Sequence, residues 1–450
     1  MSKQKESWVC TDCGNSQAKW SGSCFACKNW NTMEKMLEVI EKSPRFSVTR
    51  AKAVPLSDVK PSECERIQTG LVEIDRVFGG GVVVGSLTLL GGDPGIGKST
   101  MMLMLANQFC KLGKTVLYVC GEESAEQTSI RARRLGINAK NLFLLPETLF
   151  SHIQAQIEEI QPDVLIIDSI QIVYKSELPS LPGSVTQVKE IAMECMHIAK
   201  QQGITTFLIG HVTKSGELAG PRVLEHIVDT VLDFEGNQDH GYRILRSNKN
   251  RFGPTDEVAM FQMLREGLEE VPNPSEIFLQ ERQKEVTGSA IIPTIEGSRA
   301  ILVEVQALVA PSAFSTCARR ASGIDQNRLA LLLAVLEKKM GYHFHSLDVF
   351  VSIAGGLKIK EPSIDLGILL AISSSFCNRP IDSSTVVIGE VGLGGEIRSV
   401  PRMDARIREA IHLGFKKCVV PKKNIPKTKP KIEIIGVNRV EEVISLLLDA

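Results

Sequence analysis

The sequence lacks any long apolar run. Its most apolar stretches, such as LALLLAVL at residues 329–336, fall well short of the roughly 18 residues that a membrane-spanning helix needs. The N-terminal residues also lack the apolar core of a secretory signal. These two absences argue against a membrane or secreted protein, and we expect a soluble chain that works in the cytoplasm.

Net charge is also missing, because 52 Lys and Arg residues balance 52 Asp and Glu residues. Any affinity for nucleic acid must therefore come from local basic patches rather than from the whole surface. Eleven cysteines without a secretion signal indicate a reducing compartment, where metal ligands and buried thiols are expected before disulfides. With 43% hydrophobic and 23% charged residues, the composition is that of a globular protein.

A chain of 450 residues is too long for one hydrophobic core, and its pattern divides it into segments. Residues 1–30 are dense in Cys and Trp, and residues 31–65 lack a clear period and favour a linker. Residues 66–270 alternate apolar strand runs, such as SLTLLGG and DVLIIDS, with helical patterns, which predicts an α/β domain with a parallel sheet. Residues 271–282 form a second linker, and residues 283–450 a separate α/β domain.

Four cysteines near the N-terminus occur as two C-x-x-C pairs, Cys10 with Cys13 and Cys24 with Cys27. Each pair places two thiolates on one tight turn, and two pairs supply the tetrahedral sulfur set that zinc prefers. Four protein ligands leave no open position, so we expect a structural zinc on which the fold of this short segment depends. The alternatives are incidental thiols or a redox pair.

The stretch GGDPGIGKST matches the phosphate-binding pattern G-x-x-x-x-G-K-S. It follows the apolar run SLTLL and precedes a helical run, which is the context that the pattern requires. Backbone N–H groups of such a loop wrap the phosphates of ATP, the lysine reaches the β- and γ-phosphates, and the serine hydroxyl holds Mg²⁺. The residues expected to bind the nucleotide here are Gly92, Asp93, Pro94, Gly95, Ile96, Gly97, Lys98, Ser99 and Thr100.

Carboxylates end two further predicted strands. Glu122 and Glu123 follow TVLYVC, and a carboxylate at that place can orient the attacking water. We favour Glu122 for this role, with Glu123 as the alternative; both also suit the positive end of a helix. Asp168 ends DVLIIDS, where it is expected to reach the Mg²⁺ shell through water, although a turn-forming residue also explains it.

Three further features follow strand ends. His211 comes after ITTFLIG and is a candidate sensor of the γ-phosphate, although a lone histidine is more often an ordinary loop residue. The segments KSELPSLPGS, residues 175–184, and KSGELAGPR, residues 214–222, are expected at the same end of the sheet. Ligands bind at that end in α/β proteins, so both segments are candidate DNA contacts, or else plain connections.

Lys249 and Arg251 lie two residues apart in SNKNRFGPTDE, just before a Gly-Pro. From the residues alone, a hairpin with solvated charges and an anion-binding pair explain them equally well.

Together, the four-cysteine head, the phosphate loop, GEES, DSIQ, GHVTK and NKNRFG resemble the bacterial RadA (Sms) DNA-repair family over essentially the whole chain. The resemblance implies a RecA-type ATPase core between a zinc finger and a Lon-protease-like domain, assembled as a hexameric ring around DNA. It implies that Lys249 and Arg251 meet the γ-phosphate of the neighbouring subunit, with DNA as a second candidate partner. The implied activity is ATP-driven branch migration of recombination intermediates together with RecA, although no motif in the chain by itself shows a motor.

The C-terminal domain contains AGGLKIKEPSIDLGILLAI, which resembles the stretch around the nucleophilic serine of Lon proteases and places Ser363 at that serine. The lysine base of a Lon-type dyad falls on Asp404, and an ionised carboxylate is a far weaker base than a neutral lysine. We therefore expect a proteolytically inactive domain, with Ser363 as a helix N-cap. An ATP-dependent protease and a non-motor DNA-binding scaffold remain the alternatives to the ATPase motor.

A run of lysines without an acid lies in the same domain. Opposed to duplex phosphates, such a run would release counterions and bind DNA, but most charge runs are simply solvated, and both interpretations stay open. The lysines are Lys416, Lys417, Lys422, Lys423, Lys427, Lys429 and Lys431.

Overall fold

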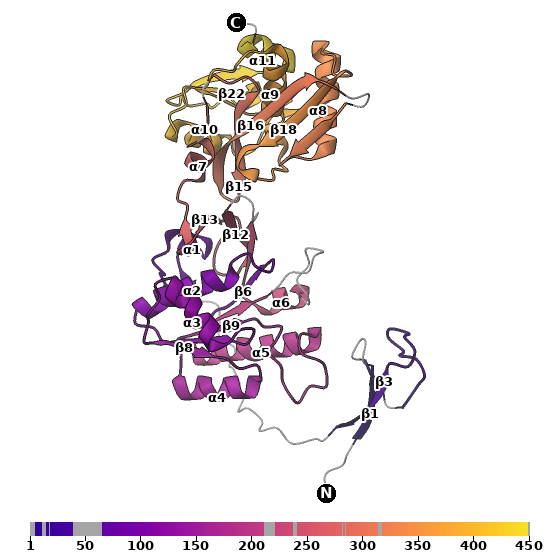
Figure 1. The fold of residues 1–450 in the computed structure, drawn as a ribbon, viewed down its shortest axis with the longest axis vertical. Helices are drawn as coiled ribbons and strands as arrows, with labels where there is room; N and C mark the ends of the chain where they lie inside the picture. The colour runs from indigo at the N-terminus through magenta and orange to yellow at the C-terminus, as the bar shows by residue number, and fades with distance from the viewer. Residues whose placement is uncertain are drawn as a thin grey trace, which may run out of the picture. The chain divides into compact units, whose positions relative to one another are not determined.

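The structure is a computed structural model, and it describes residues 5–10, 15–17, 19–38, 65–210, 221–236, 241–280, 282–283, 285–313 and 317–448. The chain divides into two compact units (Figure 1). The first, called here the P-loop unit, comprises Met1–Gly70, Gly80–Phe234 and Asn248–Gly253. The second, the C-terminal unit, comprises Leu71–Gly79, Glu235–Ser247 and Pro254–Ala450. Among the described helices, none has the length and apolarity to cross a bilayer.

The N-terminal segment folds as a small antiparallel sheet in the order β2-β1-β3. Its strands are β1 (Lys5–Cys10), β2 (Ser16–Gln17) and β3 (Met33–Glu38). The buried centre consists of Cys10, Cys24 and Met33, with Trp8 and Cys27 packed against it. A core of this size is far too small to hold a fold by apolar burial alone.

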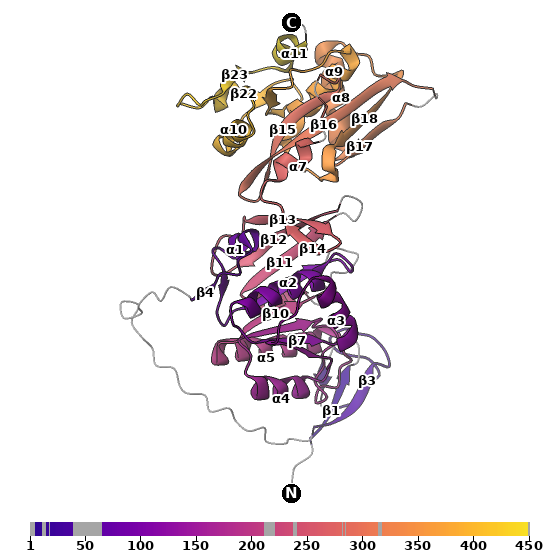
Figure 2. The same cartoon turned by 60° about the vertical axis from the view of Figure 1, so that its left-hand side comes forward.

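The P-loop unit is built on six parallel strands in the order β11-β6-β10-β9-β7-β8 (Figure 2). The strands are β6 (Leu87–Gly92), β7 (Val116–Cys120), β8 (Leu142–Leu145), β9 (Val164–Asp168), β10 (Thr205–Ile209) and β11 (Thr230–Gly236). Most are apolar throughout because helices cover both faces of a parallel sheet. The short strands β4 (Arg66–Ile67) and β5 (Val82–Val83) pair separately.

Helices cover the two faces of this sheet unequally. One face packs Leu89 and Leu208 into a core with α4, α5 and α6. Phe207 lies on the other face, because side chains alternate along a strand, and there its ring contacts Phe109 of α2. The helices are α2 (Lys98–Lys111), α3 (Ala125–Arg134), α4 (Phe150–Ile160), α5 (Val185–Gln202) and α6 (Pro221–Ile227).

The C-terminal unit begins with a helix and an antiparallel meander. These elements are α1 (Val72–Val77), β12 (Tyr242–Asn250), β13 (Val258–Leu264), β14 (Gly267–Glu270) and α7 (Pro274–Gln280). The last three residues of β12 belong to the P-loop unit, so this one strand carries residues of both units.

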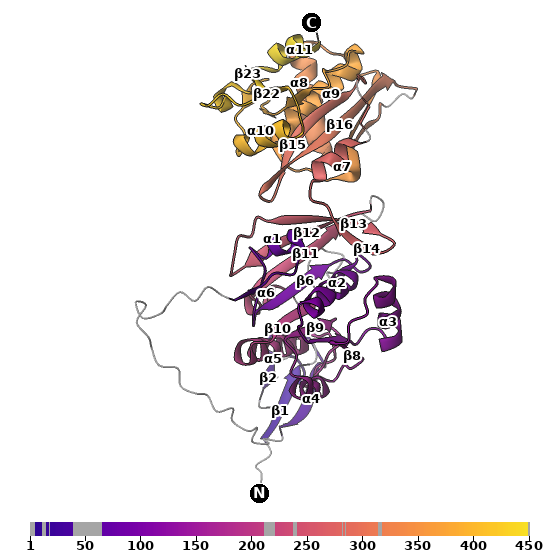
Figure 3. The same cartoon turned by 90° about the vertical axis from the view of Figure 1, so that its left-hand side faces the viewer.

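A seven-stranded mixed sheet in the order β17-β18-β16-β15-β19-β22-β23 forms the rest of the C-terminal unit (Figure 3). Helices α8, α9 and α11 pack on one face and α10 on the other. The strands are β15 (Ser289–Glu296), β16 (Arg299–Pro311), β17 (Arg319–Ser322), β18 (Leu347–Ile353), β19 (Thr385–Val387), β22 (Lys417–Pro421) and β23 (Glu433–Val437), with β20 (Glu390–Val391) and β21 (Ile397–Arg398) paired apart. The helices are α8 (Gln326–Met340), α9 (Asp365–Cys377), α10 (Met403–His412) and α11 (Val440–Leu448), with three 3₁₀ turns, η3 (Ala354–Gly356), η4 (Pro362–Ile364) and η5 (Lys422–Asn424).

The turn between β15 and β16 is seated against the meander. Gly297 has a φ of 62°, and a Cβ there would lie 2.2 Å from the carbonyl oxygen of Asp256. Polar contacts surround this close approach: Arg246–Glu296 at 2.7 Å, Glu257–Ser298 at 2.8 Å, Glu73–Arg299 at 3.0 Å and Asp256–Arg402 at 3.0 Å. The turn therefore packs in one specific arrangement, which is held by ion pairs and a hydrogen bond to the residues around it.

Helices α8 and α9 are joined by an ion pair between the buried Asp365 and the partly exposed Arg328. Asp365 is fully buried and accepts from Arg328 Nε at 2.8 Å and from the backbone N–H of Val391 at 3.1 Å. Burial raises the pKa of Asp365, and the hydrogen bonds from Arg328 and Val391 oppose that shift. The guanidinium therefore keeps a carboxylate ionised where an unpaired charge would be costly.

Replacing Arg328 by methionine should lower the unfolding free energy of the C-terminal unit by about 3–5 kcal/mol at pH 7, because the Asp365 carboxylate then loses its partner. The loss should shrink as the pH falls: without Arg328 the pKa of Asp365 rises further, and protonation removes the buried charge. Urea titrations at pH 5 and pH 7 measure both effects. Arg398→Met, which removes an exposed partner of Glu396, should change little. A loss that does not depend on pH would contradict this account.

Candidate ATP site and zinc site

The phosphate loop joins the end of β6 to the start of α2, as its pattern predicts. Gly92 has a φ of 149°, and a Cβ there would lie 2.4 Å from the carbonyl oxygen of Phe234. Gly97, with a φ of 116°, is the N-cap residue of α2. The loop therefore needs glycine at both positions, and it presents the backbone N–H groups of a helix N-terminus free of acids in its first turn. This is a cradle for phosphate.

Lys98 is folded into this loop. Its Nζ donates to the carbonyl oxygens of Gly92 at 2.7 Å and Asp93 at 2.9 Å, and the residue is 4% exposed. Burial lowers the pKa of Lys98, while the nearby carboxylates of Asp168 and Glu122 oppose the shift. The ammonium group is thus held inside the loop, which is where the pattern predicts the phosphate-binding lysine.

Asp168 lies at the end of β9, beside the start of α2. Burial raises the pKa of Asp168, while hydrogen bonds from the hydroxyls of Ser99 and Tyr118 oppose that rise. The Tyr118 hydroxyl donates to Asp168 Oδ2 at 2.7 Å. A serine hydroxyl in contact with a carboxylate at the phosphate loop suits a hard cation that prefers oxygen ligands, so the residues fit Mg²⁺.

The two adjacent glutamates have different partners. Glu122 accepts a hydrogen bond from Ser169, the neighbour of Asp168, and so lies toward the phosphate loop. Glu123 instead pairs with Arg131 of α3 at 2.5 Å. Ser124 and Gln127 form a capping box at the start of that helix. The structure therefore brings Glu122, and not Glu123, together with Asp168 and Lys98.

Lys249 and Arg251 lie at the end of the sheet opposite the phosphate loop, where the parallel strands begin. The backbone N–H of Arg251 donates to the carbonyl of Asp229 at 3.1 Å, and its guanidinium lies 3.4 Å from the Asp229 carboxylate. Asp229 immediately precedes β11, and its Oδ2 accepts from the N–H of Leu87, where β6 begins. The phosphate loop follows Gly92, five residues further along, which is about 16 Å at about 3.3 Å per residue. Neither cation can therefore reach the phosphate loop of its own subunit.

The two cations differ in their contacts. Lys249 Nζ donates to the carbonyl oxygens of Val228, at 2.9 Å, and Glu225, at the end of α6. Burial lowers the pKa of Lys249, and the positive charge of Arg251 lowers it as well. The Arg251 side chain, in contrast, is 53% exposed. The Lys249 ammonium thus has partners within its own subunit, whereas the Arg251 guanidinium, beside Asp229, is about half exposed.

Several predicted site features lie outside the described residues, namely Cys13, His211 and most of the segment 214–222. The segment 175–184 is described, and it follows β9 as expected. The amide of Gln187 organises it by donating to the carbonyls of Lys175, Leu178 and Ser180. Leu181 is 80% exposed at its tip. The contact with DNA stays a prediction.

Three of the four predicted zinc ligands come together. The Sγ atoms of Cys10, Cys24 and Cys27 lie within 4.8 Å of one another, and those of Cys10 and Cys27 are 3.6 Å apart. A zinc ion with Zn–S bonds of about 2.3 Å separates its sulfurs by about 3.8 Å, so the spacing fits. Lys28, which follows the second pair, has a φ of 61°, and its backbone N–H donates to the carbonyl oxygen of Cys24 at 2.8 Å, which closes the tight turn of this pair.

Replacing Cys24 by serine should remove the zinc, from about one ion per chain in the native protein, and unfold the N-terminal segment. Metal analysis of the purified protein and NMR spectra of residues 5–38 measure the two effects. Cys317→Ser, at a partly exposed thiol that lies outside the cluster, serves as the control. A Cys24→Ser protein that keeps its zinc would contradict this assignment.

The Lon-like serine lies in a different setting from the predicted one. Ser363 was expected to cap a helix, but this is wrong: it lies inside the 3₁₀ turn that Pro362 begins, and α9 starts at Asp365 without a side-chain cap. Ser363 is 3% exposed, and its hydroxyl has no hydrogen-bond partner among the described residues. Asp404 is exposed in the first turn of α10, whereas Arg406 is fully buried and pairs with Glu361.

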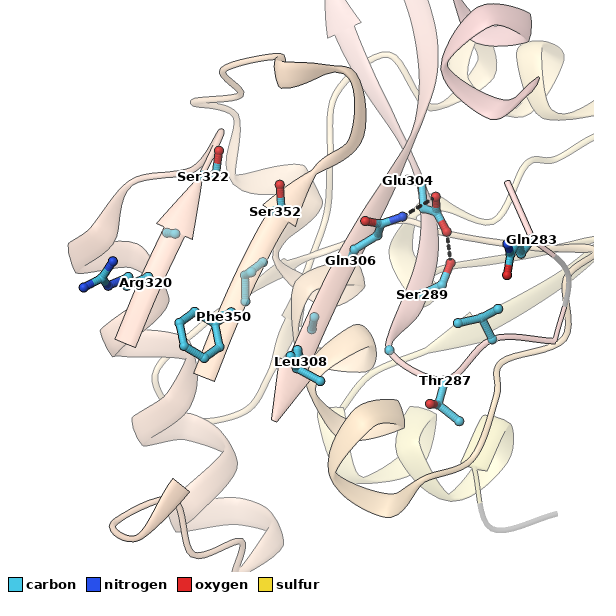
Figure 4. Close-up of a pocket in the computed structure, with 15 residues that line it drawn as sticks. Gln283, Thr287, Ser289, Glu304, Gln306, Leu308, Arg320, Ser322, Phe350 and Ser352 are labelled. Atoms are coloured by element: carbon cyan, nitrogen blue, oxygen red, sulfur yellow. Dashed lines mark hydrogen bonds between the residues drawn. The ribbon is translucent and has the colours of Figure 1, made fainter. Parts of the chain in front are cut away.

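A hollow of about 740 Å³ is lined by residues of strands β15, β16, β17 and β18 of the C-terminal sheet (Figure 4). Leu308 and Phe350 are exposed on its wall, and the buried Glu304 accepts hydrogen bonds from Ser289 and Gln306 at its floor. Because the Glu304 carboxylate already has these two donors, its burial needs no added ligand. Elsewhere in this unit, six lysines of the predicted run are exposed and Lys417 pairs with Asp382 at 3.1 Å.

Three family models match the chain. One described as an AAA domain matches residues 53–217, one described as the subunit ChlI of Mg-chelatase matches residues 303–424, and one described as a rubredoxin metal binding domain matches residues 8–35. Together with the strand–loop–helix geometry and the parallel sheet, they define the class: a P-loop ATPase with a RecA-type core, a zinc ribbon and a Lon-like C-terminal domain.

Relatives then give the family. The chain is 53% identical to the DNA repair protein RadA of Chlamydia muridarum and 50% identical to that of Bacillus subtilis, each over 99% of both chains. It is 49% identical to the DNA repair protein RadA of Halalkalibacterium halodurans over the full length of both. The chain belongs to this family of RadA DNA repair proteins, which confirms the resemblance found in the sequence. A solved KaiC-like protein from Pyrococcus horikoshii aligns with 46% of the chain at 20% identity and a TM-score of 0.40.

Proposed function

We propose that this protein is a DNA-dependent ATPase that drives branch migration of recombination intermediates, working as a ring of six subunits with a RecA-type recombinase. Full-length relatives that are named DNA repair proteins support the repair role. The position of Arg251 is the observation that supports a ring. Its exposed guanidinium lies at the end of the sheet opposite the phosphate loop of the same subunit, so it can meet a nucleotide only in a second subunit.

The chemistry follows from the residues around the phosphate loop. The loop and Lys98 bind the phosphates. Ser99 would hold Mg²⁺ and Asp168 would reach its shell through water, and the ion would supply charge neutralisation at the β- and γ-phosphates. Glu122 orients the attacking water, since its carboxylate lies toward the loop while that of Glu123 is engaged by Arg131. Arg251 of a neighbouring subunit stabilises the charge that develops on the γ-phosphate. Lys249 supports the segment from within its own subunit.

A protease is the second candidate function, but the residues at the expected catalytic positions do not support it. A Lon-type dyad needs a lysine beside the serine. Here Asp404 is exposed at the expected position of the base, and the nearby buried cation, Arg406, is already paired with Glu361. We therefore propose that the C-terminal domain is proteolytically inactive. Cleavage of a fluorogenic peptide that requires both ATP and Ser363 would overturn this.

A scaffold that binds DNA and uses ATP only to set its assembly is the third candidate. It is separated from the motor by ATP hydrolysis measured with and without single-stranded DNA. We expect DNA to stimulate hydrolysis by the native chain, and Lys98→Ala to lower both rates by at least about 10²-fold because the phosphates lose their cation. Hydrolysis that is indifferent to DNA would favour the scaffold.

A further inference from the structure

Two buried hydroxyls contact the two carboxylates of the ATP site. Tyr118, on β7, is 1% exposed, and its hydroxyl donates to Asp168 Oδ2 at 2.7 Å. Ser169 is fully buried, and its hydroxyl donates to Glu122. Each hydroxyl thus holds one carboxylate, and the motifs of the sequence point to neither of them.

The backbone fixes both hydroxyls. Tyr118 is paired in register with Ile166 on the neighbouring strand β9, two residues before Asp168, so its side chain extends along the sheet to the strand end. Ser169 lies between two anchored neighbours. The N–H of Gly121 donates to the Asp168 carbonyl at 3.1 Å, and the N–H of Ile170 donates to the Ile209 carbonyl at 3.0 Å. A donor held this firmly restricts the rotation of the carboxylate that it contacts.

The carboxylates need such restriction because they are close enough to disturb each other. Burial raises the pKa of Asp168, and repulsion by Glu122 raises it further. A hydroxyl that donates to each one stabilises its ionised form.

We propose that Tyr118 and Ser169 are positioning residues with separate tasks: Tyr118 orients Asp168 toward the Mg²⁺ shell, and Ser169 orients Glu122 toward the attacking water. This inference rests on the roles proposed above for the two carboxylates. Neither hydroxyl touches the nucleotide in this account; each acts through the side chain that it holds.

The two tasks predict different defects in the full chain. In Tyr118→Phe, the apparent Kd for Mg²⁺, titrated into the complex with a fluorescent ADP analogue, should rise about tenfold or more, with kcat near native at saturating Mg²⁺. In Ser169→Ala, the Kd for Mg²⁺ should stay native, while kcat falls about 10- to 100-fold. The acid limb of its pH–rate profile should also move to higher pH, because the ionised Glu122 has lost a donor.

Controls make the same chemical changes elsewhere. Tyr342→Phe and Ser373→Ala alter residues of the C-terminal unit and should leave both readouts unchanged. Binding of the ADP analogue without Mg²⁺ reports that each variant keeps a folded site. If both variants shift both readouts together, or neither shifts any, the division of tasks is wrong.

Variants of the two carboxylates separate the positioning role of the hydroxyls from the chemistry proposed for the site. Asp168→Asn and Glu122→Gln test the carboxylates themselves. If these two variants lose Mg²⁺ affinity and turnover respectively, while Tyr118→Phe and Ser169→Ala behave as native, the positioning role fails and the proposed chemistry stands. If Asp168→Asn binds Mg²⁺ as the native chain does, the role of Asp168 fails and the task given to Tyr118 fails with it.

Discussion

Replacing Arg251 by alanine should leave ATP binding near native and lower the rate of ATP hydrolysis by roughly 10³–10⁵-fold. The size follows from the role of a cation supplied across an interface: it meets the γ-phosphate as negative charge develops there, so its loss affects the transition state far more than the bound substrate. Nucleotide binding and single-turnover hydrolysis, both at saturating Mg²⁺, measure the two quantities. Lys249→Ala should show a smaller defect, because Lys249 is engaged at the end of α6.

Mixing two inactive variants tests whether Arg251 acts between subunits. An Arg251→Ala subunit keeps its phosphate loop, and a Lys98→Ala subunit keeps its arginine. In a ring assembled at random from equal amounts, about a quarter of the interfaces combine the intact halves and should hydrolyse ATP. A mixture no more active than its components would place Arg251 outside the neighbouring site.

Replacing Glu122 by glutamine should lower kcat by about 10²–10⁴-fold, whereas Glu123→Gln should stay within a few-fold of the native rate. The contrast follows from the partners of the two side chains. Glu122 lies beside Ser169 at the phosphate loop, and Glu123 is paired with Arg131. Because glutamine keeps the size of the side chain and removes only the basic oxygen, ATP affinity should hold in both variants.

The measurement is single-turnover hydrolysis on preformed complexes with ATP and Mg²⁺, which separates chemistry from product release. Equal defects in the two glutamine variants would show that the partners seen here do not decide the role. A larger defect in Glu123→Gln would reverse the assignment.

Sequence patterns were sufficient for the fold class, the family and the placing of the phosphate loop, because these depend on spacing. The G-x-x-x-x-G-K-S pattern fixes a strand, a loop and a helix in one order, and the cysteine pairs fix two turns. The choice between Glu122 and Glu123 could not be made from the spacing of the motif, since the two residues are adjacent. It depends on Arg131, eight residues after Glu123 in α3, and on Ser169, which directly follows β9.

Other features had no signal in the sequence. Tyr118 lies in an apolar run and looks like a core residue until the neighbouring strand brings Asp168 to its hydroxyl. The mistaken N-cap role of Ser363 has a local cause, because Pro362 starts a 3₁₀ turn that carries the serine into the interior. The edge on which Arg251 lies depends on the antiparallel return of β12, which no short motif reveals.

The seating of the β15–β16 turn has a consequence for how this chain can be cut. A fragment beginning near residue 283 would retain Glu296 and Arg299 but lose Arg246 and Glu73, which pair with them in the same compact unit. In this fragment, Glu296 and Arg299 would be left without their ion-pair partners. Limited proteolysis should therefore release a stable C-terminal domain only if the fragment includes the meander. The same holds for gene fusions that contain this domain. The unit that must stay together is discontinuous in sequence. Recombination between relatives that exchanges only the C-terminal segment would therefore separate residues that pair with one another across this turn.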